Sequence, residues 1–183
     1  MPDSSITKQA LASALKDLMQ EMPFDKIRVA HICDKCNMNR QSFYYHFQDK
    51  YELMNWIFDI EFISFIEHGG EGQSVEEMTA LLRILYDNRS FYRNALSVQG
   101  QNSLNEHIRE IALPVFKRRM QESMSVEEES FHIEFFLDTL LSAIMRWINS
   151  ENCEPPEEFI PHFFSCIIST AKYILKSILP IDR

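Results

Sequence analysis

Glycine is scarce in this chain, and its scarcity restricts the folds that the chain can adopt. Only four of the 183 residues are glycine, and three of these fall together at Gly69, Gly70 and Gly72. Because glycine and proline occur in most turns, a chain with so few of these residues is expected to form long helices. No stretch alternates apolar and polar residues for long enough to indicate a sheet. The sequence therefore predicts an all-α fold with a loop over 69–74.

Composition and charge narrow the class of protein. Hydrophobic residues make up 45% of the chain, which is typical of a globular protein with a core. The net charge is −9, but residues 1–60 hold seven Lys and Arg against eight Asp and Glu, so nearly all the excess acid lies in the rest. A basic surface around Lys35, Arg40 and Lys50 is therefore able to meet DNA.

The sequence also bears on location and on bound groups. It contains no apolar run of about 18 residues, and its first residues lack the pattern of a signal peptide. We therefore expect a cytoplasmic protein without a membrane partner, whose four cysteines are reduced thiols. No residue pattern points to a cofactor.

Two short helices joined by a tight turn are predicted in the first 50 residues. They follow a longer helix over 5–22 that Pro23 ends. Apolar residues recur at helical spacing over 29–36. Asn37 comes next, and Asn tolerates the left-handed conformation that a tight turn needs. A second short helix over 39–46 then completes a helix-turn-helix.

The helix over 39–46 has an apolar face and a polar face. Phe43 and Phe47 are four residues apart, so both point inward. Asn39 is a favourable N-cap. Exposed aromatic and polar groups in a row indicate a contact surface, and a helix that lies in a DNA groove needs such a surface. The polar face consists of Arg40, Gln41, Tyr44, Tyr45 and His46.

The rest of the chain is predicted to be helical as well. A helix over about 49–67 is apolar on more than one side, which indicates a connector buried between two bodies. The last two of the later helices carry more apolar residues than one face each can bury, so the surplus either lines a cavity or packs on a second copy. Pro114 should kink the third of the later helices. These helices are expected over 75–87, 89–97, 102–123, 126–149 and 156–179.

Three segments of the first third of the chain follow a specific pattern. They are Phe24-Asp25-Lys26-Ile27-Arg28, Phe43-Tyr44-Tyr45-His46-Phe47 and Lys50-Tyr51-Glu52-Leu53. On these segments the chain resembles the tetracycline-repressor (TetR) family of bacterial regulators. The resemblance implies a homodimer with an N-terminal three-helix helix-turn-helix domain and a C-terminal helical ligand and dimerisation domain. The domains expected are a helix-turn-helix domain over 1–48, a connector helix over 49–68, and an effector-binding and dimerisation domain over 69–183.

The resemblance also implies a partner, double-stranded operator DNA, and roles for single residues. Backbone contacts, which give affinity without sequence information, are expected from Tyr44, His46 and Lys50. Contacts to base edges are expected from Arg40, Gln41 and Tyr45. Position 28 is usually a capping Thr in the family, so Arg28 loses that cap but can reach a phosphate. The full set expected at the DNA is Arg28, Asn39, Arg40, Gln41, Ser42, Tyr44, Tyr45, His46 and Lys50.

The sequence leaves two kinds of effector open, a small molecule and a protein. For a small molecule we expect a closed cavity lined by the helices over 102–123 and 126–149, with Arg146 or His132 at its wall. Arg146 can otherwise pair with an acid at 127–129 or at 134. A narrower resemblance, to regulators of dihydroxyacetone-kinase operons, implies an activator gated by a kinase-subunit-like protein. A protein effector predicts an interior filled by Phe and Leu.

Two other patterns suggest a metal site or a catalytic site, and each lacks a required part. His31, Cys33 and Cys36 have a spacing that suggests zinc, but such a site needs a fourth ligand, and both cysteines occupy buried helix positions. Histidines elsewhere in the chain lie near Glu, but no nucleophile–base pair at motif spacing accompanies them. We therefore expect no metal site and no enzymatic activity.

Overall fold

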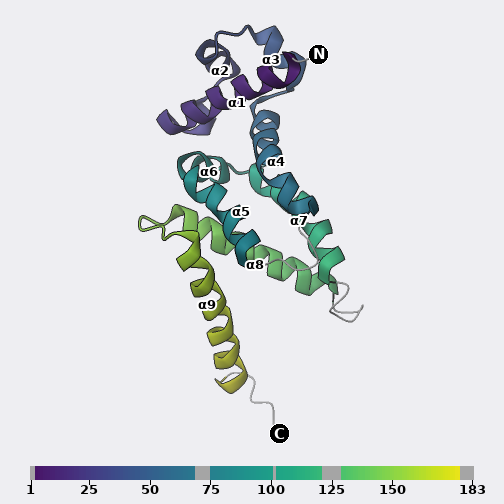
Figure 1. Ribbon diagram of the computed structural model, residues 1–183, viewed down its shortest axis with the longest axis vertical. Coiled ribbons are helices and arrows are strands. Elements are labelled where there is room, and N and C mark those ends of the chain that lie inside the picture. The colour runs from purple at the N-terminus through teal and green to yellow at the C-terminus, as the bar shows by residue number, and fades with distance from the viewer. Residues whose placement is uncertain (1–2, 69–74, 101, 121–128, 178–183) are drawn as a thin grey trace.

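The computed structural model describes residues 3–68, 75–100, 102–120 and 129–177, and within these ranges all regular structure is helical. The all-α fold is confirmed. In Figure 1 the first three helices lie at one end of the molecule, α4 leads away from them, and α9 extends to the other end. The α-helices are α1 (Asp3–Glu21), α2 (Val29–Lys35), α3 (Arg40–His46), α4 (Lys50–His68), α5 (Val75–Asp87), α6 (Arg89–Leu96), α7 (Leu104–Met120), α8 (Glu129–Asn149) and α9 (Pro156–Ser177).

The helices lie where the sequence predicts them, with small shifts at their ends. α1 begins at Asp3 rather than 5, and α7 begins at Leu104 rather than 102. The loop expected over 69–74 and the helix ends expected at 123, 126 and 179 lie outside the described residues. Pro114 lies inside α7, and the kink there stays a prediction, as do the domain boundaries.

The turn between α2 and α3 closes on the residue that the sequence indicates. Asn37 adopts a φ of 55°, in the left-handed region. The Met38 N–H donates to the Cys33 carbonyl at 2.9 Å, and the Asn37 N–H donates to the Asp34 carbonyl at 3.3 Å. This pair of bonds forms a Schellman motif, which satisfies the last carbonyls of α2. The direction of α3 therefore follows from Asn37.

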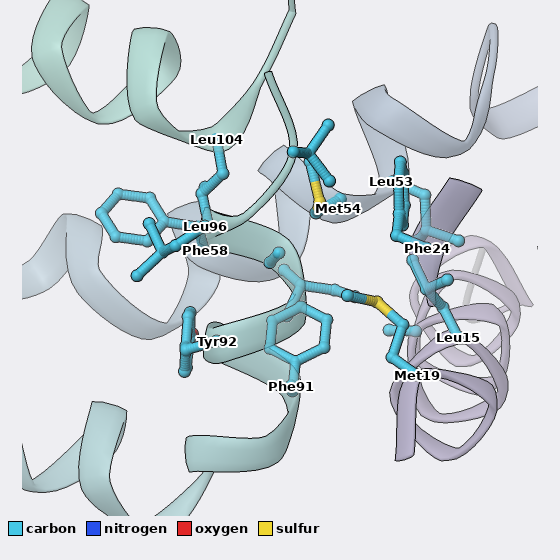
Figure 2. Close-up of a cluster of buried hydrophobic side chains, with 14 of the residues drawn as sticks. Leu15, Met19, Phe24, Leu53, Met54, Phe58, Phe91, Tyr92, Leu96 and Leu104 are labelled. Carbon is cyan, nitrogen blue, oxygen red and sulfur yellow. The ribbon is translucent and has the colours of Figure 1, made fainter. Parts of the chain in front are cut away.

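One apolar cluster fills the space where α1, α4 and α6 meet, as Figure 2 shows. Burying one Leu or Phe side chain contributes about 1.5–3 kcal/mol, so this cluster holds the helix-turn-helix end to the rest of the molecule. Its members include Leu15 and Met19 from α1, Leu53, Met54 and Phe58 from α4, and Phe91, Tyr92 and Leu96 from α6.

A buried hydroxyl lies at the edge of this cluster. The Tyr92 side chain is fully buried, and its Oη donates to the carboxylate of Glu61 in α4. The same carboxylate pairs with Lys16 of α1. Burial, followed by the nearby charge of Glu61, raises the pKa of Tyr92 far above its ordinary value. Tyr92 therefore keeps its proton in the folded protein.

A short 3-10 turn, η1 (Phe24–Lys26), connects α1 to α2 and is held by a lysine from α4. The Lys50 Nζ donates to the carbonyl oxygens of Phe24 at 2.7 Å and Ile27 at 2.9 Å. It also lies 4.3 Å from the centroid of the buried Phe24 ring, a cation–π contact. Burial lowers the pKa of Lys50. The ammonium thus ties the start of α4 to the turn that leads into α2.

α9 contacts the other helices mainly through its first turns, and in Figure 1 it projects away from them. The Phe159 ring stacks on Trp147 of α8 with 4.8 Å between centroids, and Ile160 is buried. From Pro161 to Ser177 no residue of α9 is buried. The exposed large apolar residues in this part are Phe164, Ile168, Tyr173, Ile174 and Leu175.

Tyr92 predicts a loss of stability in alkali. The unfolded chain releases the phenolic proton near pH 10, whereas the folded protein holds it to a higher pH. The folded state then binds more protons, so the free energy of unfolding should fall as pH rises from about 9 to about 11, by up to about 1.4 kcal/mol per unit. Denaturant unfolding over this range should give a smaller slope for Tyr92→Phe. Tyr45→Phe, an exposed ring, should keep the wild-type slope, and an equal loss of slope in both variants would contradict the assignment.

Candidate nucleic-acid interface

α3 buries one face and exposes the other, as the sequence predicts. Phe43 and Phe47 are buried, with 5.9 Å between their ring centroids. Asn39 is the N-cap, since its Oδ1 accepts from the Ser42 N–H at 2.8 Å and from the Ser42 hydroxyl at 3.1 Å. The aromatic pair and the cap together determine which side chains of α3 face solvent.

The outward face of α3 is polar and aromatic. Arg40 and Gln41 are exposed in the first turn. The Tyr44 and Tyr45 side chains follow, at 57% and 80% exposure. His46 is half-buried, and its ring meets the Tyr45 ring edge-on at 4.8 Å between centroids. Large aromatic groups this far from a core indicate a contact surface. The structure thus places six of the predicted residues, these five and Ser42, on one short helix.

Arg28 precedes α2 as its N-cap residue. Its side chain is exposed and makes no cap hydrogen bond, so the expected loss of the Thr-type cap is confirmed. The Arg28 backbone N–H donates to Nδ1 of His31 at 3.3 Å. Lys35, which the sequence placed in the basic surface, pairs with Glu21 at 2.9 Å. Glu21 therefore offsets the charge of Lys35, while the guanidinium of Arg40 is exposed on α3 itself.

Lys50 is held differently from the other predicted DNA contacts. Its ammonium lies against the carbonyl oxygens of Phe24, Asp25 and Ile27. An ammonium has three hydrogens to donate, so these carbonyls take up its capacity. A phosphate contact would require Lys50 to leave at least one of them. The contact between Lys50 and a phosphate stays a prediction.

The two residues predicted for an effector cavity do not lie together. Arg146 and His132 are both exposed on α8. They are fourteen positions apart on one helix, which separates them by about 21 Å along its axis. Arg109 of α7 pairs with Glu134 at 3.5 Å and also with Asp138. The role of Arg146 and His132 in binding an effector stays a prediction.

Two hollows lie elsewhere on the described part of the molecule, and both are open to solvent. One, of about 460 Å³, lies between α5 and α9 and is mostly apolar. The other, of about 620 Å³, lies beside α4 and α7 and is polar. Neither includes Arg146 or His132. The second is lined by Asn55, Asn102, Glu106, His107, Arg109 and Glu110.

Of the two cysteines expected at buried helix positions, Cys33 is buried in α2, whereas Cys36 is the C-cap of that helix and is half-buried. Cys33 is buried, and the Cys36 Sγ donates to the Ile32 carbonyl at 3.2 Å. Burial raises the pKa of both thiols. Among the residues that the structure describes, no three His, Cys, Asp or Glu side chains gather where they could hold a metal. Within the same residues, no helix has the length and apolarity to cross a bilayer.

Asn94 of α6 has contacts that local sequence patterns do not indicate. Its side-chain amide bonds to backbone groups of Met19, Met22 and Phe24, at least seventy residues earlier in the chain. Asn is a poor helix former, so its presence in the middle of a short helix is a weak signal that the side chain has another role.

Two family models match the chain. One, described as "Bacterial regulatory proteins, tetR family", matches residues 11–56, which include the helix-turn-helix. The other, described as "Transcriptional regulator C-terminal region", matches residues 74–169, more than half of the chain. The resemblance found from the motifs in the first third of the chain therefore extends over most of its length.

A curated relative is also a transcriptional regulator, in agreement with these family matches. The HTH-type dhaKLM operon transcriptional activator DhaS of Lactococcus lactis is 37% identical over 94 residues. That match covers 51% of this chain and 50% of the relative, so the chain spans about half the length of the curated relative it matches.

Two solved structures share the fold. The dihydroxyacetone kinase operon activator DhaS has a TM-score of 0.66 at 24% identity, covering 91% of this chain and 97% of that one. A TetR transcriptional regulator from Streptococcus agalactiae has a TM-score of 0.70 at 20% identity, covering 91% and 96%. With the geometry of α2 and α3 and the two family matches, the chain belongs to the TetR family of bacterial transcriptional regulators.

Proposed function

We propose that this protein is a homodimeric regulator of transcription that binds a specific operator through α3 and responds to an effector on its C-terminal domain. The outward face of α3 carries the proposal, because it exposes a guanidinium, an amide and two phenols on a helix whose other face is buried. Such a helix fits the major groove, with its N-terminal residues nearest the base edges.

The contacts divide by position along α3. Arg40 and Gln41 lie in the first turn, and Tyr45 lies four residues beyond Gln41 on the same side, so we assign these three to base edges. We assign Tyr44, His46 and the exposed Arg28 to the sugar-phosphate backbone.

Dimerisation is proposed through α8 and α9. The distal part of α9 exposes five large apolar side chains. Phe131 and Phe135 of α8 stack on each other, 6.0 Å between centroids, and are exposed as well. Covering these faces with those of a second copy would bury them. The two reading helices would then lie about 34–36 Å apart, one turn of DNA.

The effector is proposed to act on the C-terminal domain. The polar hollow beside α4 and α7 supports a small polar molecule, since its walls offer amides, carboxylates and a guanidinium. A molecule bound there would contact the helix that leads to the DNA-binding end.

A second candidate is an activator of a dihydroxyacetone-kinase operon that is gated by a protein partner. The 37% identity to the DhaS activator favours it. Transcription in vitro from a promoter that carries the preferred DNA sequence shows whether the protein activates or represses transcription. For this candidate the purified protein should raise transcript yield, and a fall in yield would contradict it.

Gln41 should carry sequence discrimination. The DNA probe is the duplex that the wild-type protein enriches from a randomised pool. Gln41→Ala should weaken binding to this duplex by about 1–3 kcal/mol and hardly change binding to random DNA, because an amide discriminates bases and not phosphates. Gln48→Ala, an exposed Gln just beyond α3, should bind both DNAs like the wild type. Equal weakening on both DNAs by Gln41→Ala would show that α3 faces the groove in another way.

The dimer should depend on the exposed face of α9. Sedimentation velocity at micromolar concentration should give a dimer for the wild type and a monomer for Ile168→Glu, since the new carboxylate would be buried in the contact. Ile6→Glu, the same change at an exposed site on α1, should remain dimeric. A monomeric wild type would remove the proposed assembly.

A further inference from the structure

The side chain of Asn94 bridges α6 and the DNA-binding end. Its Nδ2 donates to the carbonyl oxygens of Met19 at 3.0 Å and Met22 at 2.9 Å. Its Oδ1 accepts from the Phe24 N–H at 2.9 Å. All three distances are those of well-formed hydrogen bonds, and both amide hydrogens are engaged. One side chain therefore holds three backbone groups in the segment that runs from the last turn of α1 to the start of η1.

These backbone groups have few other partners available to them. The last carbonyls of a helix lack intrahelical partners, and Met19 lies in the last turn of α1, while Met22 directly follows the helix. Phe24 is held from two sides, because its N–H bonds to Asn94 and its carbonyl accepts from Lys50. The residue that begins η1 is thus attached to α6 and to α4 by its own backbone.

The contact between α1 and α6 is otherwise largely apolar. Met19 of α1 and Phe91 of α6 belong to the cluster in Figure 2. Apolar contacts are not directional, so they hold two helices together without defining their relative rotation. Hydrogen bonds depend on direction, and Asn94 makes three to the segment that joins the end of α1 to η1. The second polar link of α6 to this end, through Tyr92 and Glu61 to Lys16, lies beside Phe91.

We infer that Asn94 is a positioning residue that sets the angle of the DNA-binding end against the C-terminal body. The inference rests on the proposed function, because in the dimer this angle determines how far apart the two reading helices lie. An operator with half-sites at one spacing is bound well only if that distance is defined in advance. Without the Asn94 amide the DNA-binding end should rotate more freely, and the protein should accept other spacings.

The test measures spacing preference with full-length protein. The probes are the duplex enriched by the wild type and two derivatives, with one base pair added or removed between the half-sites. Wild type should lose about tenfold or more in affinity on each derivative. Asn94→Ala should bind the parent duplex about tenfold more weakly, since up to three hydrogen bonds are lost, and lose less than about threefold further on the derivatives.

Two more variants separate positioning from general damage. Asn105→Ala removes an amide that donates to the Leu96 carbonyl at 2.9 Å within the C-terminal domain, so it should keep the wild-type spacing preference. Asn94→Asp keeps the acceptor for the Phe24 N–H but can no longer donate to the two carbonyls. Asn94→Asp should fold, and it should weaken the preference for one half-site spacing as Asn94→Ala does. It replaces the alanine variant in the test if that variant is not soluble.

Amide hydrogen exchange gives a readout without DNA. The Phe24 amide should exchange faster in Asn94→Ala than in Asn105→Ala, because only the former loses its acceptor. Unchanged exchange, or an Asn94 variant that keeps both the affinity and the spacing penalty of the wild type, would overturn the inference. A wild type that enriches no duplex would instead overturn the proposed function, while the exchange result would still decide whether Asn94 holds the turn.

Discussion

Burial of apolar side chains between α1, α4 and α6 is the interaction on which the other features depend. α1 packs against α2 and α3 on one side and reaches α6 on the other, so the DNA-binding end and the C-terminal body share one core. The exposed face of α3 has a defined orientation only because Phe43 and Phe47 are buried in that core. A rigid base is what allows a short helix to present side chains to a groove.

Polar contacts then refine what the apolar core holds. Examples are the Glu61 carboxylate with its two partners, the Lys50 ammonium on η1, and the Asn94 amide on the segment from Met19 to Phe24. Each joins elements distant in sequence, and each satisfies groups that would be costly to leave unpaired away from water. Apolar burial therefore supplies most of the stability, and the directional hydrogen bonds define how the helices are oriented.

Local patterns predicted most of the fold and much of the candidate site. The left-handed Asn37, the cap at Asn39 and the inward pair Phe43 and Phe47 all depend on residues within a few positions of each other. The role of Asn94 could not be predicted in this way, because its partners lie about seventy residues earlier and become neighbours only in the folded chain. The enclosure of Lys50 by carbonyls has the same origin.

The projecting α9 has a consequence for the amount of protein as well as for its shape. An isolated helix of this length gains most of its stability from packing, and the distal turns of α9 pack on little within one chain. In the proposed dimer, ordering of these turns and association are one event, so the thermal midpoint should rise with protein concentration. Mass action would then make the regulator least stable when it is scarce.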